Sequence, residues 1–349
     1  MKNLIFLLCI IVVFASCSDD GYQEPQNQQE PVVINPYITG KDLSTSYSLH
    51  YENKWADEKF NALGYGYDIT GKYAHPSSIR SQVFEAERYK PEFNYEYGVI
   101  KRSWFTHGGL GTLEGTREEI TQELLLDIGL DDNKKYKNAF RKMFEDPFED
   151  DITHVDVEYH YAIDAFASEW YRVWLYEDDL KKIKPFLSSE FKNDIQNMSA
   201  SKIVEKYGTH VISSFSYGRK TQFIYRASSD YQLKERMVYA SAKYFGCTPG
   251  IWMEPGPANY PDKENIYLEI IGGNSQFPNA WMIDMTNDGK TPLDYKLSSD
   301  ADDSNIVLVN FQRADEWPFR KPLDPIYEFV DDAEKRLALE KAVEDYLSK

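Results

Sequence analysis

The chain has 349 residues, with 57 acidic and 39 basic side chains, which gives a net charge of −18 at pH 7. An isoelectric point near 4.8 argues against nucleic acid as a partner and against simple electrostatic attachment to anionic lipid. Hydrophobic residues make up 42% and charged residues 28%, which excludes global disorder and allows a sizeable buried core.

The first 16 residues are typical of an export signal. Lys2 precedes an apolar run over residues 4–14, which is too short for a bilayer span of about 20 residues. Small residues, Cys17 and an acidic Ser-Asp-Asp stretch follow. This order resembles a bacterial lipoprotein signal, in which cleavage leaves an acylated Cys17 as the first residue. The alternative is an ordinary signal peptide that contains a cysteine.

The acidic stretch resembles the tag that directs lipoproteins of Bacteroides-like bacteria to the outer face of the outer membrane. Residues 17–36 are rich in Gln, Glu, Asn and Pro, so we expect an acylated cysteine followed by a flexible tether. Cys9 leaves with the signal and Cys17 carries lipid, so no disulfide or thiolate zinc site is expected for the remaining Cys247. One domain is expected over residues 37–349.

The first helical pattern of this domain covers residues 116–146. Thr116 and Glu119 have the spacing of a capping box, and apolar side chains recur at helical spacing at Ile120, Leu124 and Ile128. A second short helix is expected over residues 133–144.

The clearest strand pattern follows, over residues 155–163, where apolar and polar residues alternate so that one face is buried and the other meets solvent. Helices are expected within residues 177–213 and over 231–245 and 332–347. Strands are expected over residues 211–227, 266–271 and 306–311, with a kink or bulge at Gly218. Long helical insertions between strands favour an α+β fold.

The sequence contains no nucleophile elbow, phosphate loop, zinc-protease motif or paired Cys-x-x-Cys, so we expect no enzyme and no cofactor. The polar face of this strand pattern carries four side chains of the types that bind metals. Residues two apart on a strand lie about 6.7 Å apart, so four such side chains span about 20 Å and cannot share one ion. A metal is therefore rejected at His154, Asp156, Glu158 and His160.

The most informative segment is Tyr207, Gly208, Thr209 and His210, followed by Gly218. Gly208 permits a tight bend at a helix end, and the next two side chains can form hydrogen bonds across that bend. A lone histidine beside a β-branched run is more often structural than catalytic.

This segment resembles the signature of the membrane-attack-complex/perforin (MACPF) family. Residues 63–68 resemble the opening strand of that domain, residues 186–191 resemble the stretch before the signature, and residues 271–273 and 325–347 resemble its closing part. The resemblance implies a bent, twisted four-stranded antiparallel sheet flanked by two helical clusters, with residues 207–210 and Gly218 as structural hinge positions. The chain departs from the family pattern at Val211, where an aromatic is usual, and at Arg219, where a second glycine is usual.

In lytic members of the family the two clusters unfold into membrane-inserting hairpins. A hairpin needs about 20 residues plus a turn, and the first helical cluster, residues 112–150, is long enough. Five apolar side chains would share one face if this stretch became a strand: Ile120, Leu124, Leu126, Ile128 and Leu130. The second helical cluster, about residues 229–264, contains four prolines after residue 248, which remove backbone donors from a strand.

The sequence therefore predicts a perforin-like lipoprotein, anchored on the exterior of the outer membrane or released, that makes pores in neighbouring cells. Its expected partners are a target membrane or a surface receptor (glycan, lipopolysaccharide or outer-membrane protein) and other copies in a ring. The alternative is a non-lytic adhesion lipoprotein that keeps the fold and binds glycan or protein through a surface rich in its 26 tyrosines.

Overall fold

The computed structural model describes residues 40–42, 62–92, 97–101, 113–132, 134–148, 158–175, 179–228, 264–272, 280–284, 307–311 and 321–349. All of them lie in one compact unit, residues 37–349. Two sheets and several helices form this unit, and the strands within each sheet are antiparallel neighbours.

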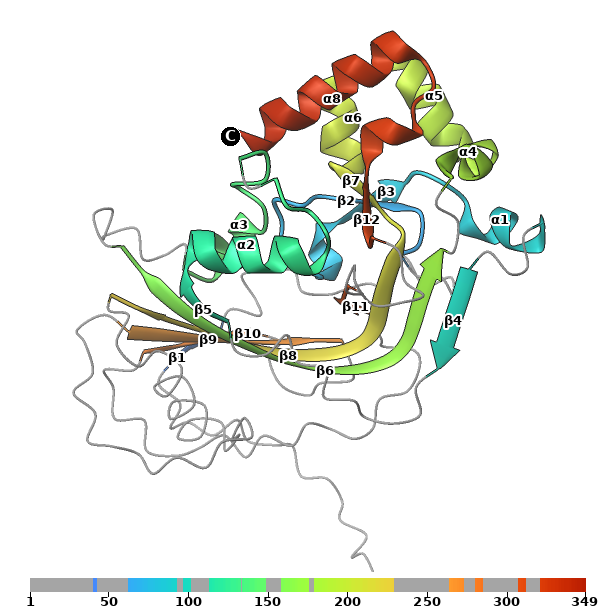
Figure 1. Cartoon of the computed structure of the whole chain (residues 1–349). Helices are drawn as coiled ribbons and strands as arrows, with labels where there is room; N and C mark the ends of the chain where they lie inside the picture. Colours follow the sequence, from blue (N-terminus) through green and yellow to red (C-terminus); the bar gives the residue numbers. More distant parts are fainter. Residues whose placement is uncertain are drawn as a thin grey trace, which may run out of the picture. The chain divides into compact units, whose positions relative to one another are not determined.

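Two long strands form the centre of the large sheet. β6 (His160–Leu175) and β8 (Ser214–Ala227) pair along their lengths and curve together (Figure 1). One half of this pair is flanked by β5 (Leu113–Thr116), β9 (Glu264–Ile271), β10 (Ala280–Asp284) and β1 (Gly40–Asp42). The other half is flanked by β4 (Tyr97–Lys101) and β11 (Val307–Asn310). The predicted α+β fold with a bent antiparallel sheet is confirmed, and β10, β9, β8 and β6 are four adjacent strands within it.

A change of register lies between the two halves. Glu169 of β6 pairs with Gly218, whereas Tyr171 pairs with Tyr217, so Trp170 is an extra residue on β6. Such a bulge bends a strand and increases its twist. A bulge was predicted at Gly218. The structure instead has β8 continuous through Gly218 and the extra residue on the partner strand β6.

A small sheet continues from the end of β8. β7 (His210–Ile212) leads into β8 and pairs with β12 (Leu323–Pro325) and β2 (Tyr65–Tyr67), and β2 pairs with β3 (Ile79–Gln82). Helices surround this sheet in Figure 1: α1 (Ala86–Glu92), α4 (Leu180–Ile183), α5 (Ser189–Asn197), α6 (Ala200–Tyr207) and α8 (Ala333–Leu347). The helices predicted within residues 177–213 and over 332–347 are confirmed.

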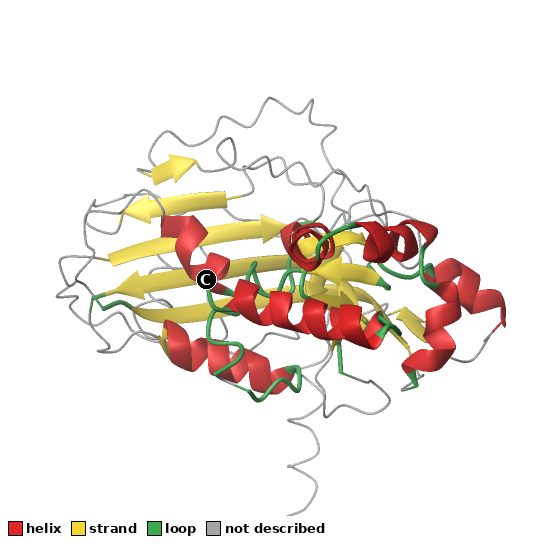
Figure 2. Ribbon diagram, turned by 90° about the horizontal axis from the view of Figure 1, so that it is seen from above, coloured by secondary structure: helices red, strands yellow, loops and turns green. Residues whose placement is uncertain are grey.

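The first helical cluster lies over one face of the large sheet, as the view from above in Figure 2 shows. It contains α2 (Arg117–Asp127), α3 (Arg141–Glu145) and the 3-10 turn η3 (Asp146–Phe148). The predicted capping box between Thr116 and Glu119 is present at the start of α2.

The helix predicted over residues 133–144 is wrong except near its end, where α3 forms. Phe140 has a left-handed backbone with φ 55°. Its N–H donates to the carbonyl of Ile69 (2.7 Å), and the N–H of Lys142 donates to that of Thr70 (3.2 Å). These backbone donors bind the neighbouring loop and do not continue a helix.

The strand predicted over residues 155–163 begins only at His160, and residues 155–157 lie outside the described residues. Tyr161 and Ile163 are buried as predicted. Asp164 continues the polar side of this pattern but is only 6% exposed, so that side of the strand does not face solvent there. A carboxylate can be buried in a sheet where partners compensate for lost water, so polarity alone did not reveal the outer face.

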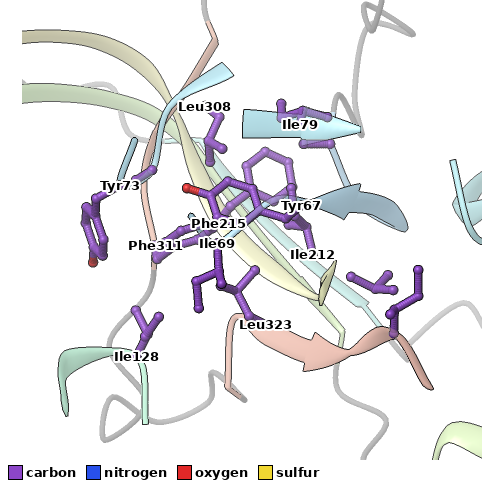
Figure 3. Packing of buried hydrophobic residues seen from close by; sticks show 14 of the residues in the cluster. Tyr67, Ile69, Tyr73, Ile79, Ile128, Ile212, Phe215, Leu308, Phe311 and Leu323 are labelled. Atoms are coloured by element: carbon purple, nitrogen blue, oxygen red, sulfur yellow. The ribbon is translucent and has the colours of Figure 1, made fainter. Parts of the chain in front are cut away.

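One hydrophobic core joins both sheets and the first helical cluster. Figure 3 shows Tyr67 from β2, Phe215 from β8 and Ile128 from the cluster converging on it. Phe311 makes edge-to-face contacts with Tyr67 (5.2 Å between ring centroids) and with Tyr73 (5.5 Å). Tyr73 also meets Phe140 of the first helical cluster edge to face, with 5.0 Å between ring centroids. Such aromatic pairs are worth about 1 kcal/mol each beyond burial, so the cluster shares in the stability of the whole unit.

Candidate functional site

The signature segment, residues 207–210, connects α6 to β7. Gly208 ends α6 with φ 76°, a conformation that suits glycine alone. A Cβ atom on Gly208 would lie 2.5 Å from the backbone of Tyr67, and one on Gly66 would lie 1.8 Å from the carbonyl oxygen of Tyr207. The two glycines let β2 and the signature segment touch backbone to backbone.

Thr209 uses both backbone and side chain to hold this junction. Its N–H donates to the carbonyl of Tyr67 (2.9 Å), and its carbonyl accepts from the N–H of Ile326 (3.0 Å). Its hydroxyl oxygen accepts from the N–H of Ile69 (3.2 Å). The segment therefore binds the start and the end of the domain to each other.

Tyr207 anchors the helical side of the junction. Its buried hydroxyl donates to Asp194 of α5 (2.8 Å), and the same carboxylate oxygen accepts from Lys206 (2.6 Å). The lysine contact and the tyrosine hydrogen bond lower the pKa of Asp194. The carboxylate thus stays ionised and holds α5 against α6.

His210 connects the signature segment to the first helical cluster. Its ring is fully buried, with Nδ1 2.9 Å from the hydroxyl of Thr209 and Nε2 3.3 Å from the hydroxyl of Tyr136. Burial, with a smaller contribution from the positive charge of Lys135, lowers the pKa of His210 to about 3. The imidazole is therefore neutral near pH 7, suited to hydrogen bonding and weak as a general base.

Further side-chain contacts fasten the cluster to the C-terminal part. Lys135 donates to the hydroxyl of Tyr327 (3.1 Å), and its ammonium lies over that ring. Asn138 donates to the carbonyl of Leu347 at the end of α8 (2.9 Å).

A second set of contacts fastens the cluster to the large sheet. Phe144 meets Tyr161 of β6 edge to face, with 5.0 Å between ring centroids. The guanidinium of Arg226, at the end of β8, lies 3.9 Å from the ring centre of Phe148 and 4.2 Å from that of Tyr159. Cation–π contacts of this kind contribute about 1–2 kcal/mol when desolvated.

The five candidate insertion residues lie on α2 and just after it. Four of them are buried in the core and one, Leu126, is 55% exposed: Ile120, Leu124, Ile128 and Leu130 make up the buried set. The helical spacing predicted for Ile120, Leu124 and Ile128 is confirmed, and their insertion into a membrane stays a prediction.

Of the other positions predicted from the sequence, some lie outside the described residues and some lie in the large sheet. Cys17, His154, Asp156 and residues 229–263 lie outside the described residues, and Gly218 pairs with Glu169 and with Val307 in the large sheet. None of the helices within the described ranges is both long and apolar enough to cross a membrane.

Sequence reasoning missed Tyr136 as the partner of His210 and missed a buried group of charged side chains. This group comprises Lys72, His75, Lys220 and Glu269. A signal was present, because Lys220 and Glu269 stand two or four residues from buried apolar side chains on the same face of their strands. A charged residue in register with a core face points to a buried partner.

Known structures share the overall fold of this chain. GNIP1Aa from Chromobacterium piscinae matches with a TM-score of 0.57 and 18% identity over 83% of this chain. A putative cell invasion protein with a MAC/perforin domain from Bacteroides thetaiotaomicron matches with a TM-score of 0.59 and 12% identity over 91% of it. The chain spans 56% and 64% of the lengths of these two proteins. The sequence itself matches no family model and no curated protein.

These likenesses define the class, an α+β protein built on a bent antiparallel sheet of the perforin type. The chain has the MACPF fold, as the signature segment implied.

Proposed function

We propose that this chain is a surface-anchored, perforin-like lipoprotein that forms pores in the membranes of neighbouring cells and acts as an antimicrobial. The observation that carries this proposal is the double pattern of the first helical cluster. As a helix, α2 buries Ile120 and Leu124 in the core. As a strand, even positions from 120 to 130 would be apolar except Gln122, and odd positions would be mostly polar. A membrane-spanning strand needs this alternation.

The way the cluster is held supports its release. The first helical cluster is contacted by the side chains of His210, Tyr327 and Arg226. Water can replace these contacts while the backbone pairing of β6 with β8 stays intact. An unfolded cluster would follow β5 directly, at the edge of the large sheet. New hairpin strands could then extend strands that already exist.

Anchoring through Cys17 and the polar tether is part of the proposal. The lipid would hold the protein at the exterior of the outer membrane, and release from it would allow action at a distance. The proposed partners are a target membrane or a surface receptor and further copies of the chain in a ring. Cys17→Ala should move the protein from the membrane fraction to the soluble fraction, and a membrane-bound variant without an acyl group would contradict lipidation.

The proposed action needs no catalysis. His210, the only titratable side chain of the signature besides a tyrosine, lies between two hydroxyl groups and has a pKa lowered by burial to about 3. Such a histidine is better suited to holding Tyr136 than to moving protons at neutral pH.

The test of the proposed function uses the purified chain on dye-loaded liposomes and on bacterial cells. We expect dye release together with ring-shaped assemblies in electron micrographs. Binding without dye release would favour the second candidate, a non-lytic adhesion lipoprotein. The four prolines of the second helical cluster favour that candidate, because each removes a donor that the bilayer interior cannot replace.

A further inference from the structure

The loop between β2 and β3 crosses from the small sheet to the bend of the large sheet. It covers residues 68–78 and ends in the 3-10 turn η2 (Pro76–Ser78). Ala74 in this loop has a left-handed backbone with φ 42°, which is unfavourable for a residue with a Cβ atom. Something must hold the loop in this conformation.

Charged side chains connect the loop to β9. The ammonium of Lys72 lies 3.0 Å and 3.2 Å from the two carboxylate oxygens of Glu269, and it donates to the hydroxyl of Tyr267 (3.3 Å). Nε2 of His75 lies 3.2 Å from the same carboxylate. Glu269 is 1% exposed, so both loop residues meet a carboxylate that water scarcely reaches.

A second buried cation connects the loop to β8. Lys220 is 2% exposed, and its ammonium donates to the carbonyls of Ala74 (3.1 Å) and Tyr73 (3.4 Å). It therefore caps the left-handed turn. Lys220 follows Gly218 by two residues, so this contact lies beside the bulge of the large sheet.

The charge states follow from the surroundings. Burial lowers the pKa of Lys220 to about 7 and that of His75 to about 4, although Glu269 opposes both shifts. Burial acts to raise the pKa of Glu269, but the attraction of Lys72 and His75 is stronger, so the pKa is lowered. At neutral pH Glu269 and Lys72 form an ion pair, and His75 is a neutral hydrogen-bonding partner.

We propose that Lys72, His75, Lys220 and Glu269 form a bend lock, which couples the 68–78 loop to β8 and β9 at the bend of the sheet so that these segments open together. An apolar contact would hold the loop but would resist exposure to water. Ions regain hydration once they separate, and this offsets part of the cost of breaking a buried ionic contact. The role of the bend lock in releasing the first helical cluster rests on the proposed function; the coupling itself does not.

Hydrogen exchange of the full-length chain tests the coupling without any variant. Amides of the loop, including that of Lys72, and amides of β9 should become accessible in one common opening step. Loop amides that exchange at least tenfold faster than those of β9 would overturn the bend lock.

Glu269→Gln sharpens the test, because it keeps hydrogen-bonding atoms but leaves the ammonium of Lys72 without its anion. We expect exchange to rise at least tenfold in the loop and in β9 together. Glu114→Gln is the matched control, an exposed carboxylate on β5 of the same sheet, and should change neither. A rise confined to the loop would contradict the coupling.

If Glu269→Gln does not fold, Lys72→Met combined with Glu269→Gln removes both charges of the ion pair and should restore folding and part of the protection. A double variant that also fails to fold would overturn the pairing, and the wild-type exchange pattern still decides the coupling.

Because the readout is exchange and not lysis, an inactive protein with coupled exchange would contradict only the proposed function. A lytic protein with uncoupled exchange would contradict only the bend lock.

Discussion

The signature junction and the first helical cluster are held in the fold by different kinds of contact. At the junction, backbone meets backbone: Gly66 and Gly208 allow a close approach, and Thr209 closes it with hydrogen bonds. Beyond β5, the cluster is held mostly by side chains, among them Tyr136 and Phe148. Its described residues also make two backbone hydrogen bonds to the 68–78 loop.

The proposed function requires this difference, because one part must stay fixed while the other is released. Side-chain contacts can break one at a time, with water taking the place of each partner. Where two backbones pack too closely to admit a side chain, the segments must separate as a whole before water can enter. His210 lies at the boundary, because its backbone belongs to β7 and its ring contacts the cluster. We therefore expect substitutions at the junction to unfold the domain and substitutions at the cluster contacts to loosen the cluster alone.

The largest effect is expected for Gly208→Ala. The φ of 76° is strained for alanine, and the new Cβ atom would overlap the backbone of Tyr67. Strain and overlap together should lower the free energy of unfolding by about 4 kcal/mol, measured by chemical denaturation. Lys202→Ala, on the exposed face of α6, is the control and should change it by less than about 0.5 kcal/mol. Equal effects of the two substitutions would show that the backbone conformation and close approach at Gly208 do not contribute to stability.

Acid should destabilise the fold through two buried histidines, His75 in the 68–78 loop and His210 at the boundary of the two regions. Burial lowers the pKa of His75 to about 4, where Lys72 and Lys220 add to the shift and Glu269 opposes it. Burial lowers the pKa of His210 to about 3, where Lys135 adds to the shift and Asp68 opposes it. Because the folded pKa values are depressed, this stability is complete above about pH 6.5 and falls as the pH drops toward them.

Between pH 6.5 and 5 the two histidines together should cost up to about 4 kcal/mol of unfolding free energy. Denaturation curves across this range measure the slope. In His210→Ala the slope should fall by about half, and an unchanged slope would show that His210 is not protonated on opening.

His210→Ala itself should lower the free energy of unfolding at pH 7 by about 1–3 kcal/mol, because Thr209 and Tyr136 lose a buried partner. Thermal or chemical unfolding checks this value. A variant with wild-type stability and no activity would point to direct ligand contact or catalysis instead.

The smallest effect is expected for Tyr136→Phe, which removes one hydroxyl at the boundary. About 1 kcal/mol of stability should be lost, and hydrogen exchange should rise in α2 and α3 but not in β7. Increased exchange in β7 as well would mean that the two regions open as one unit.

The sequence predicted the fixed region better than the releasable one. The glycine and the neighbouring polar residues of the signature act locally, so Gly208 at a helix end could be inferred without tertiary contacts. The capping box at Thr116 was found for the same reason. Phe140 was assigned to a helix because its spacing fits one, but its N–H binds Ile69, which lies 71 positions earlier in the sequence.

The bend lock shows the same limit. Lys220 and Glu269 belong to neighbouring strands but owe their burial to a loop near residue 74, and one sequence does not reveal this contact. Their positions on buried strand faces are visible in the pattern. Their partners depend on the topology.

The proposed function requires the first helical cluster to leave the large sheet and enter a membrane while the small sheet and its helices stay folded. Two exposed leucines provide matched positions for an environment-sensitive fluorophore, Leu126 on α2 (55% exposed) and Leu337 on α8 (67% exposed). Each is replaced by cysteine in a Cys247→Ser background and labelled. On liposomes that the protein binds, the probe at position 126 should shift to a lipid-like emission and the probe at position 337 should not. Bound protein in which neither probe shifts, or in which both shift alike, would contradict the account.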